Sequence, residues 1–199
     1  VRSRGLGDVY KRQVLPASYD YLRLEGRMQY RLNLPPIGYS QLMLEGGKIF
    51  GKVPYLLLKL HEGNGTYFYD RYAFSCMNFY EFSSDAWISF FYEHHFNGFL
   101  LGRVPLLKKL NWREVFVFKG VYGTLSARND GSLPNTKAVM LFPVGMSSVE
   151  HPYLETGFGI ENIFRLLRVD CIWRLTHHRA VPGLSIPTFT VNFSLNLKF

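Results

Sequence analysis

The chain has 199 residues, of which 47% are hydrophobic and 17% are aromatic, and its formal net charge is +8. No stretch approaches the ~18 uncharged apolar residues that a spanning helix requires, which excludes a helical membrane protein. Lysines and arginines are scattered and match no recognition motif, so nucleic-acid binding is not expected. We attribute the positive charge to a solvated interior and loops, with attraction to anionic lipid head groups as the alternative.

The first residues look foreign to the rest of the chain. Residues 1–13 resemble a translated sequencing-adapter remnant, and the chain opens on Val1 without a signal peptide. We therefore exclude residues 1–13 from fold reasoning. We expect residues 14–199 to be one domain, the C-terminal part of a longer protein.

The first strong pattern covers residues 20–34. Apolar side chains alternate there with a polar row that includes Arg23, Glu25, Arg27 and Arg31. Neighbouring side chains of a strand point to opposite faces, so the pattern predicts a strand with one apolar and one charged face. A cation facing lipid at the membrane midplane costs about 2–4 kcal/mol, so the charged row is predicted to face a polar lumen.

Weaker patterns follow in the middle of the chain. The segment 115–118 is apolar on both faces, so its orientation stays open. Proline and glycine predict a turn at 35–38, and polar residues predict loops at 128–136 and 179–183. We predict four further strands here: 39–49, 66–78, 85–97 and 112–126.

Two more strands are predicted at 153–163 and 166–177, joined by a short link near Ile163–Arg165. Arg168, Asp170 and Arg174 share one side of the second strand. Glu155 and Glu161 fall on the predicted lumen side of the first strand. Glu161 and Asp170 are predicted to balance Arg168 and Arg174 across the hairpin.

The end of the chain alternates without exception from Thr188 to Phe199. This strand is longer than the roughly five or six residues of a soluble strand. A terminal Phe closing such a strand resembles the assembly signal of bacterial outer-membrane barrels. We assign that signal to the apolar row at the end of the strand: Phe193, Leu195, Leu197 and Phe199.

These patterns together predict an all-β fold, an antiparallel transmembrane β-barrel of about eight strands. Eight is the smallest number of strands in a membrane barrel. Because we expect an upstream part to be missing, we expect the native barrel to be larger and this chain to be an incomplete, C-terminal fragment of it. The predicted lumen network consists of Arg23, Glu25, Arg27, Arg31, Glu161, Arg168, Asp170 and Arg174.

No chemistry-bearing motif stands out. Ser89, Glu93 and His95 share strand parity, but Ser89 is roughly 20 Å from His95 along an extended strand. Adjacent histidines on a strand point to opposite faces and cannot chelate one ion alone. We therefore predict no catalytic, cofactor or metal residues, and Cys171 is interpreted as a lipid-facing hydrophobe.

Several stretches carry a family resemblance: Leu42–Tyr55, Tyr69–Phe74, Met77–Phe82, Glu93–Gly98, Arg103–Leu110 and Gly159–Ile163. They look like the C-terminal barrel of the outer-membrane family of unknown function usually named "carboxypeptidase-like regulatory domain-containing". The resemblance implies an upstream β-sandwich domain, no peptidase activity and no agreed catalytic residues. It also implies a distant similarity to outer-membrane assembly and translocation barrels, and hence a role in moving or inserting macromolecules.

The functional prediction is a non-enzymatic barrel in the outer membrane of a Gram-negative bacterium, acting as a passage, assembly factor or surface scaffold. Its expected partners are outer-membrane lipid and the barrel assembly machinery. One alternative is a barrel-embedded hydrolase that uses His95. The other is a secreted, soluble β-sandwich binding module, in which the apolar strand faces pack on a second sheet.

Overall fold

The computed structural model describes residues 2–6, 19–132, 138, 140–149, 151–178 and 185–195, and this part of the chain is almost entirely β-structure. Its strands are β1 (Arg2–Leu6), β2 (Tyr21–Asn33), β3 (Tyr39–Gly51), β4 (Lys59–Leu60), β5 (Phe82–Ser84), β6 (Ala86–His95), β7 (Arg113–Thr124), β8 (Ser147–Ser148), β9 (Tyr153–Ile163), β10 (Leu167–Arg174) and β11 (Phe189–Leu195). Three single helical turns accompany them, η1 (Tyr55–Leu57), η2 (Leu101–Arg103) and α1 (Pro105–Lys108). Among the described residues, no helix has the length and apolar character needed to cross a membrane.

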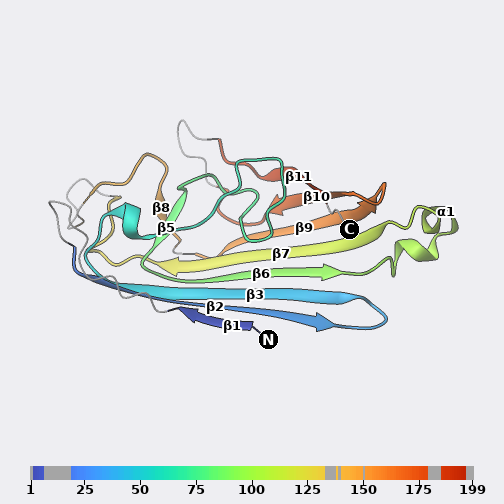
Figure 1. Cartoon of the computed structure of the whole chain (residues 1–199). Coiled ribbons are helices and arrows are strands. Elements are labelled where there is room, and N and C mark those ends of the chain that lie inside the picture. Colours follow the sequence, from blue (N-terminus) through green and yellow to red (C-terminus); the bar gives the residue numbers. More distant parts are fainter. Residues whose placement is uncertain are drawn as a thin grey trace.

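Eight strands form one sheet in the order β1-β2-β3-β6-β7-β9-β10-β11, and every neighbouring pair is antiparallel (Figure 1). The connections at one end of the sheet include two short turns, at residues 34–38 and 164–166. All connections at the other end are long. We call the first the short-turn end. A three-stranded sheet, β4-β5-β8, lies to one side of the large sheet (Figure 1).

The two faces of the large sheet differ in chemistry. We call the face that carries Glu45, Glu93, Lys119, Glu155 and Arg174 the polar face, and the opposite one the apolar face. All of those charged side chains are at most 4% exposed. The apolar face carries large hydrophobic side chains that are between 37% and 63% exposed: Leu22, Leu24, Met28, Tyr30, Leu32, Phe50, Ile88, Tyr122, Phe158, Trp173, Phe189, Phe193 and Leu195.

The connection from β3 to β6, residues 52–85, covers the polar face (Figure 1). We call it the covering segment. Its Phe74, Met77 and Phe82 pack against side chains of the sheet in one apolar cluster, which includes Met43, Phe91, Val121 and Tyr153. A second cluster joins Val53 and Leu58 of the segment to Ile49 and Trp87 of the sheet. The core of the described structure therefore lies between the sheet and a segment with little regular structure.

The prediction of a strand at 66–78 is wrong. Residues 66–78 form turns and isolated bridges, with short contacts such as the Gly63–Phe74 bridge. Phe74 and Met77 of this stretch pack into the core on the polar face, whereas Tyr67 and Phe68 are exposed. The predicted strands at 20–34, 39–49, 85–97, 112–126, 153–163 and 166–177 correspond to β2, β3, β6, β7, β9 and β10.

The two edge strands of the large sheet are β1 and β11. β1 lies inside residues 1–13, which the sequence analysis set aside, and it pairs with β2. β11 occupies only part of the predicted last strand, and Leu197 and Phe199 lie outside the described residues. On its outer side, Phe193 exchanges backbone hydrogen bonds with Tyr67 and Tyr69 of the covering segment, both at 2.7 Å. In the described part of the chain β11 has no second neighbouring strand, so this sheet is open.

The structure also settles the orientation of the apolar run 115–118. Val115 and Val117 point to the polar face and are completely buried, whereas Phe116 and Phe118 lie on the apolar face. Phe116 contacts Phe158 on β9, with ring centroids 5.2 Å apart. The run is apolar on both faces because Val115 and Val117 are buried on the polar face while Phe116 and Phe118 lie on the apolar face.

Candidate functional site: a charged network beneath the covering segment

Arg174 on β10 is fully enclosed and holds the end of the covering segment. Its guanidinium contacts the Glu81 carboxylate at 2.5 and 3.2 Å and donates to the Cys76 carbonyl at 3.1 Å. It also lies 4.8 Å from the centre of the Tyr153 ring. Charge-assisted hydrogen bonds of this bidentate kind are stronger than neutral ones. Arg174 therefore ties the covering segment to the sheet at a fixed position.

Glu155 on β9 acts as a buried acceptor for the backbone of the same segment. Its carboxylate receives the amide hydrogens of Ser75 at 2.9 Å and Cys76 at 2.7 Å, and the Tyr153 hydroxyl at 2.6 Å. These two amide groups belong to a turn and have no partner strand, and they need other acceptors because buried unpaired backbone groups are costly. The carboxylate thus replaces a neighbouring strand for this turn.

Lys119 on β7 donates hydrogen bonds to backbone carbonyl groups of the covering segment. The side chain is 0% exposed. Its ammonium donates to the backbone carbonyls of Asp70 at 2.7 Å and Ala73 at 2.6 Å, and lies 4.5 Å from the centre of the Tyr69 ring. A buried ammonium needs such acceptors, because it would otherwise lose its hydration without compensation.

Glu93 on β6 is the most connected acid of the network. It accepts hydrogen bonds from the Tyr69 hydroxyl, from Arg71 Nε at 2.7 Å and from Arg168 Nη2 at 3.2 Å. Arg168 in turn contacts Asp170 at 2.8 Å. Burial raises the pKa of Tyr69 well above its usual range, and the Glu93 carboxylate adds to that shift, so the phenol remains a donor.

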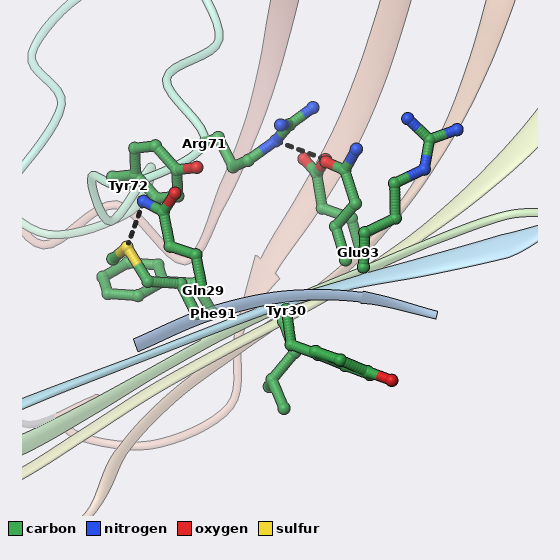
Figure 2. A pocket seen from close by; sticks show the side chains of 10 residues that line it. Gln29, Tyr30, Arg71, Tyr72, Phe91 and Glu93 are labelled. Atoms are coloured by element: carbon green, nitrogen blue, oxygen red, sulfur yellow. Dashed lines mark hydrogen bonds and ion pairs between the residues drawn. The ribbon is translucent and has the colours of Figure 1, made fainter. Parts of the chain in front are cut away.

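A pocket of about 380 Å³ opens beside Glu93, between β2, β3 and the covering segment. Figure 2 shows Gln29, Arg71, Tyr72 and Glu93 on one side of the β2 ribbon, with Tyr30 projecting to the other. The Arg71–Glu93 ion pair crosses this space (Figure 2). The pocket therefore combines charged and amide groups with an apolar floor, which includes Phe91.

All residues of the predicted lumen network share the polar face, but the structure groups them differently from the prediction. Arg23 contacts Glu25 at 2.8 Å, and Arg168 contacts Asp170. Glu161 meets His95 at 3.2 Å, so the expected charge balance across the β9–β10 hairpin is not observed. The remaining arginines have partners elsewhere: Arg27 contacts Glu45, Arg31 lies over the Tyr39 ring, and Arg174 contacts Glu81.

Lys119, a central member of the network, was not predicted from the sequence, and Glu93 was considered only as a catalytic candidate. Glu155 was predicted on the lumen side by its strand parity with Glu161, but it was not assigned to the network. Lys119 directly follows the ambiguous run 115–118, which hid its parity. The partners Glu81 and Tyr69 lie in the covering segment, where strand periodicity carries no information.

The residues considered for hydrolysis do not form a triad in the described chain. His95 Nε2 lies 3.4 Å from Glu93 and Nδ1 lies 3.2 Å from Glu161, so both ring nitrogens face carboxylates. No serine hydroxyl is bonded to His95 among the described residues; Ser89 is 3% exposed on the same face of β6. A nucleophile and its base must lie within hydrogen-bond reach, which this arrangement does not provide.

Other reactive side chains are enclosed in the covering segment. Burial raises the pKa of the Cys76 thiol to about 12, and the Glu155 carboxylate adds to this shift. Burial lowers the pKa of the His61 imidazole to about 3, with Lys59 as a second cause, and its Nε2 lies 2.9 Å from Ser84 Oγ. Within the described ranges, no group of three or more His, Cys, Asp or Glu side chains is arranged to hold a metal ion.

No curated protein matches the chain. A protein-family model described as "Family of unknown function (DUF5686) C-terminal domain" matches residues 10–127. The match begins inside the segment set aside as foreign and covers β2 to β7 with the covering segment. The chain therefore belongs to this family of unknown function, DUF5686, through its C-terminal domain.

Proposed function

We propose that this chain forms part of the wall of an antiparallel transmembrane β-barrel in the outer membrane of a Gram-negative bacterium, with the covering segment inside the lumen. The observation that carries the proposal is the reversed burial of the sheet. Phe158 is 59% exposed, while Glu155 on the same strand is 0% exposed. Lipid on the apolar face accounts for this pattern, because outer-membrane strands alternate apolar-out and polar-in.

The alternative of a soluble β-sandwich predicts the opposite arrangement. A sandwich buries its apolar faces between two sheets and exposes its polar ones. In the described chain, the small sheet and the covering segment both lie against the polar face. β2 and β3, at 13 residues each, also have the length that a tilted membrane strand needs, about 9–11 residues.

A membrane wall of this kind requires closure. An open strand edge cannot be satisfied by lipid, since each unpaired backbone group there is costly. The proposal therefore includes further strands that pair with the free edges of the sheet. Recognition by the barrel assembly machinery is assigned to the apolar end of the last strand, Phe193, Leu195, Leu197 and Phe199.

Because the covering segment occupies the polar face, this proposal excludes an open pore as the role of the protein. A lumen that contains a segment tied down by Arg174, Glu155 and Lys119 is not an open pore. We infer a non-enzymatic role as a gated passage, an assembly factor or a surface scaffold, which agrees with the resemblance to "carboxypeptidase-like regulatory domain-containing" barrels and their distant assembly and translocation relatives. The hydrolase alternative predicts an activity that is lost in His95→Ala.

The experiment that tests the proposal expresses the full-length gene with an export signal in a Gram-negative host. The membranes are fractionated, and the protein is run on a gel with and without boiling, beside a variant lacking Phe199. We expect an outer-membrane protein whose mobility changes on boiling and whose assembly weakens without Phe199. A soluble periplasmic product that is indifferent to Phe199 would overturn the proposal.

A further inference from the structure

A groove of about 730 Å³ lies at the short-turn end of the sheet, away from the charged network. The connection between β6 and β7, residues 96–112, contains η2 and α1 and forms one side of the groove together with Arg113 at the start of β7. The β9–β10 turn contributes Asn162, Phe164 and Arg165 to the other side. Figure 1 shows α1 projecting at this end, beyond the tips of β6 and β9.

The groove is lined by cations. Lys108, Lys109, Arg113 and Arg165 line it, and no aspartate or glutamate does. Within the described chain, none of these cations has an ion-pair partner within 4 Å. Like charges in one concave surface repel each other and raise the local concentration of anions. The groove is therefore complementary to a negatively charged ligand.

The rim of the groove is apolar. Phe164 is 85% exposed and Leu110 is 48% exposed, while Trp112 lies half-buried in the lining. Leu100 and Val104, on the same connection, are 50% and 45% exposed. Cations beside exposed leucine and aromatic side chains are typical of elements at the boundary between head groups and acyl chains.

The β9–β10 turn keeps two bulky residues in an unfavourable backbone conformation. Leu166 N donates to the Ile163 carbonyl at 3.1 Å, which makes Phe164 and Arg165 the central residues of a two-residue hairpin turn. Their φ angles are 50° and 67°. Such turns favour Asn-Gly, because a positive φ is unfavourable for bulky side chains. Strain of this kind is retained where the side chains themselves are needed.

We propose that this groove binds the phosphate head group of an anionic phospholipid. Lys108, Lys109, Arg113 and Arg165 contact the phosphate, and Leu110 and Phe164 enter the acyl boundary. The inference rests on the proposed function, since it needs the apolar face in a bilayer. Short turns mark the periplasmic end of outer-membrane barrels, so the lipid belongs to the periplasmic leaflet.

Trp112 provides the measurement, because it lies in the groove lining. The full-length protein, with the strands that complete the barrel, is inserted into phosphatidylcholine vesicles that contain either brominated phosphatidylglycerol or brominated phosphatidylcholine at the same fraction. Subtracting the signal of Trp112→Phe isolates the quenching of Trp112. We expect stronger quenching by the anionic lipid. This excess disappears when Lys108, Lys109, Arg113 and Arg165 are all changed to Gln.

Two control variants sharpen the result. Lys52→Gln with Arg128→Gln removes two exposed cations that lie outside the groove, and the excess quenching should persist. Phe164→Asn with Arg165→Gly supplies a favourable turn sequence, so the folded barrel should tolerate more urea while the preference for anionic lipid decreases. A decrease in folding with this variant would contradict the argument from strain.

The outcomes separate the two proposals. Trp173 is 41% exposed on the apolar face, so both brominated lipids should quench it in an inserted barrel. Equal quenching of Trp112 by both lipids, with Trp173 quenched, overturns the groove proposal alone. Absence of Trp173 quenching by either lipid overturns the membrane proposal on which it rests.

Discussion

β2 and β10 have the same sequence pattern and different surroundings. Each carries an Arg and an acid two residues apart on the polar face, Arg23 with Glu25 and Arg168 with Asp170. On β2 both side chains are 30% exposed, whereas on β10 they are 3% and 0% exposed. On β10 the covering segment places the Tyr69 ring 4.4 Å from the Arg168 guanidinium, and its Arg71 contacts Glu93, which Arg168 also contacts. Burial of a charged row is thus a property of the neighbouring element, not of the strand.

This comparison has an energetic consequence. Exposed ion pairs contribute about 0–1 kcal/mol to stability. Removing one member of a buried pair costs about 3–5 kcal/mol, because the remaining charge is left without a partner. The strands at the two sides of the sheet should therefore respond very differently to equivalent substitutions.

The largest effect is expected for Arg174→Met. This change leaves the Glu81 carboxylate, the Cys76 carbonyl and the His177 carbonyl without their donor, so the free energy of unfolding should fall by about 3–5 kcal/mol. The matched control is Arg31→Met on β2, which removes only an exposed stacking contact with Tyr39 and should cost about 0.5–1 kcal/mol. Urea unfolding of the folded protein in vesicles measures both. An equal loss of unfolding free energy in Arg174→Met and Arg31→Met would contradict the proposed difference between β10 and β2.

The next effect concerns the apolar face. Phe158→Arg should destabilise the protein by about 2–4 kcal/mol in a bilayer, because the cation faces the lipid core. In a soluble protein the same exposed position would tolerate arginine within about 0.5 kcal/mol. The free energy of unfolding of the full-length protein in vesicles distinguishes these cases, and a loss within about 0.5 kcal/mol would contradict lipid at this position.

A smaller effect is expected for Glu155→Gln. The amide oxygen can accept from one of the two backbone amides, but the NH₂ group then faces the amide hydrogen of the other, Ser75 or Cys76, so the change should cost about 1–3 kcal/mol. The loss concerns local attachment, so chymotrypsin should cleave faster at Tyr67 and Phe68, which are 77% and 68% exposed. Glu25→Gln on β2 should leave the cleavage rate unchanged. A faster rate in both variants would mean that the covering segment is not held by Glu155.

The smallest effect concerns mild acidification, over the first pH unit below pH 6.5. His61 titrates near pH 6.5 when unfolded and near pH 3 when folded, so the unfolded state binds more protons between these values. Stability should therefore fall as pH drops below 6.5, by up to about 1.4 kcal/mol per pH unit from this group. In His61→Gln this component is absent, so the stability–pH profiles of the two proteins should converge on acidification. Parallel profiles from pH 7 to pH 4 would contradict the assignment.

The strands that were predicted correctly share one property: their two faces meet different environments. In β2, β9 and β10 an apolar row alternates with a polar row, so the period of two is visible in the residues themselves. At 115–118, the buried Val115 and Val117 replace polar residues on the polar face, and the period disappears. At 66–78, Phe74 and Met77 fill a core without forming a strand, which explains the error there.

The ion pairs also fall into two groups, those that strand geometry predicts and those that depend on the covering segment. Arg23 with Glu25 and Arg168 with Asp170 are two residues apart, and strand geometry alone predicts that their side chains can meet. The Arg174–Glu81 contact joins residues 93 positions apart, and the partner comes from a segment with irregular backbone. Its existence depends on how residues 52–85 return over the sheet.

The sequence by itself determined the period, the apolar row and the charged row of most strands, because these follow from local backbone geometry and the opposite directions of neighbouring side chains. Only the tertiary structure decided which charges are buried, since burial depends on the covering segment that lies over the polar face. It also decided the partners of Glu93, Lys119 and Glu155, because buried charges must be satisfied by whatever donors and acceptors the folded chain brings to them.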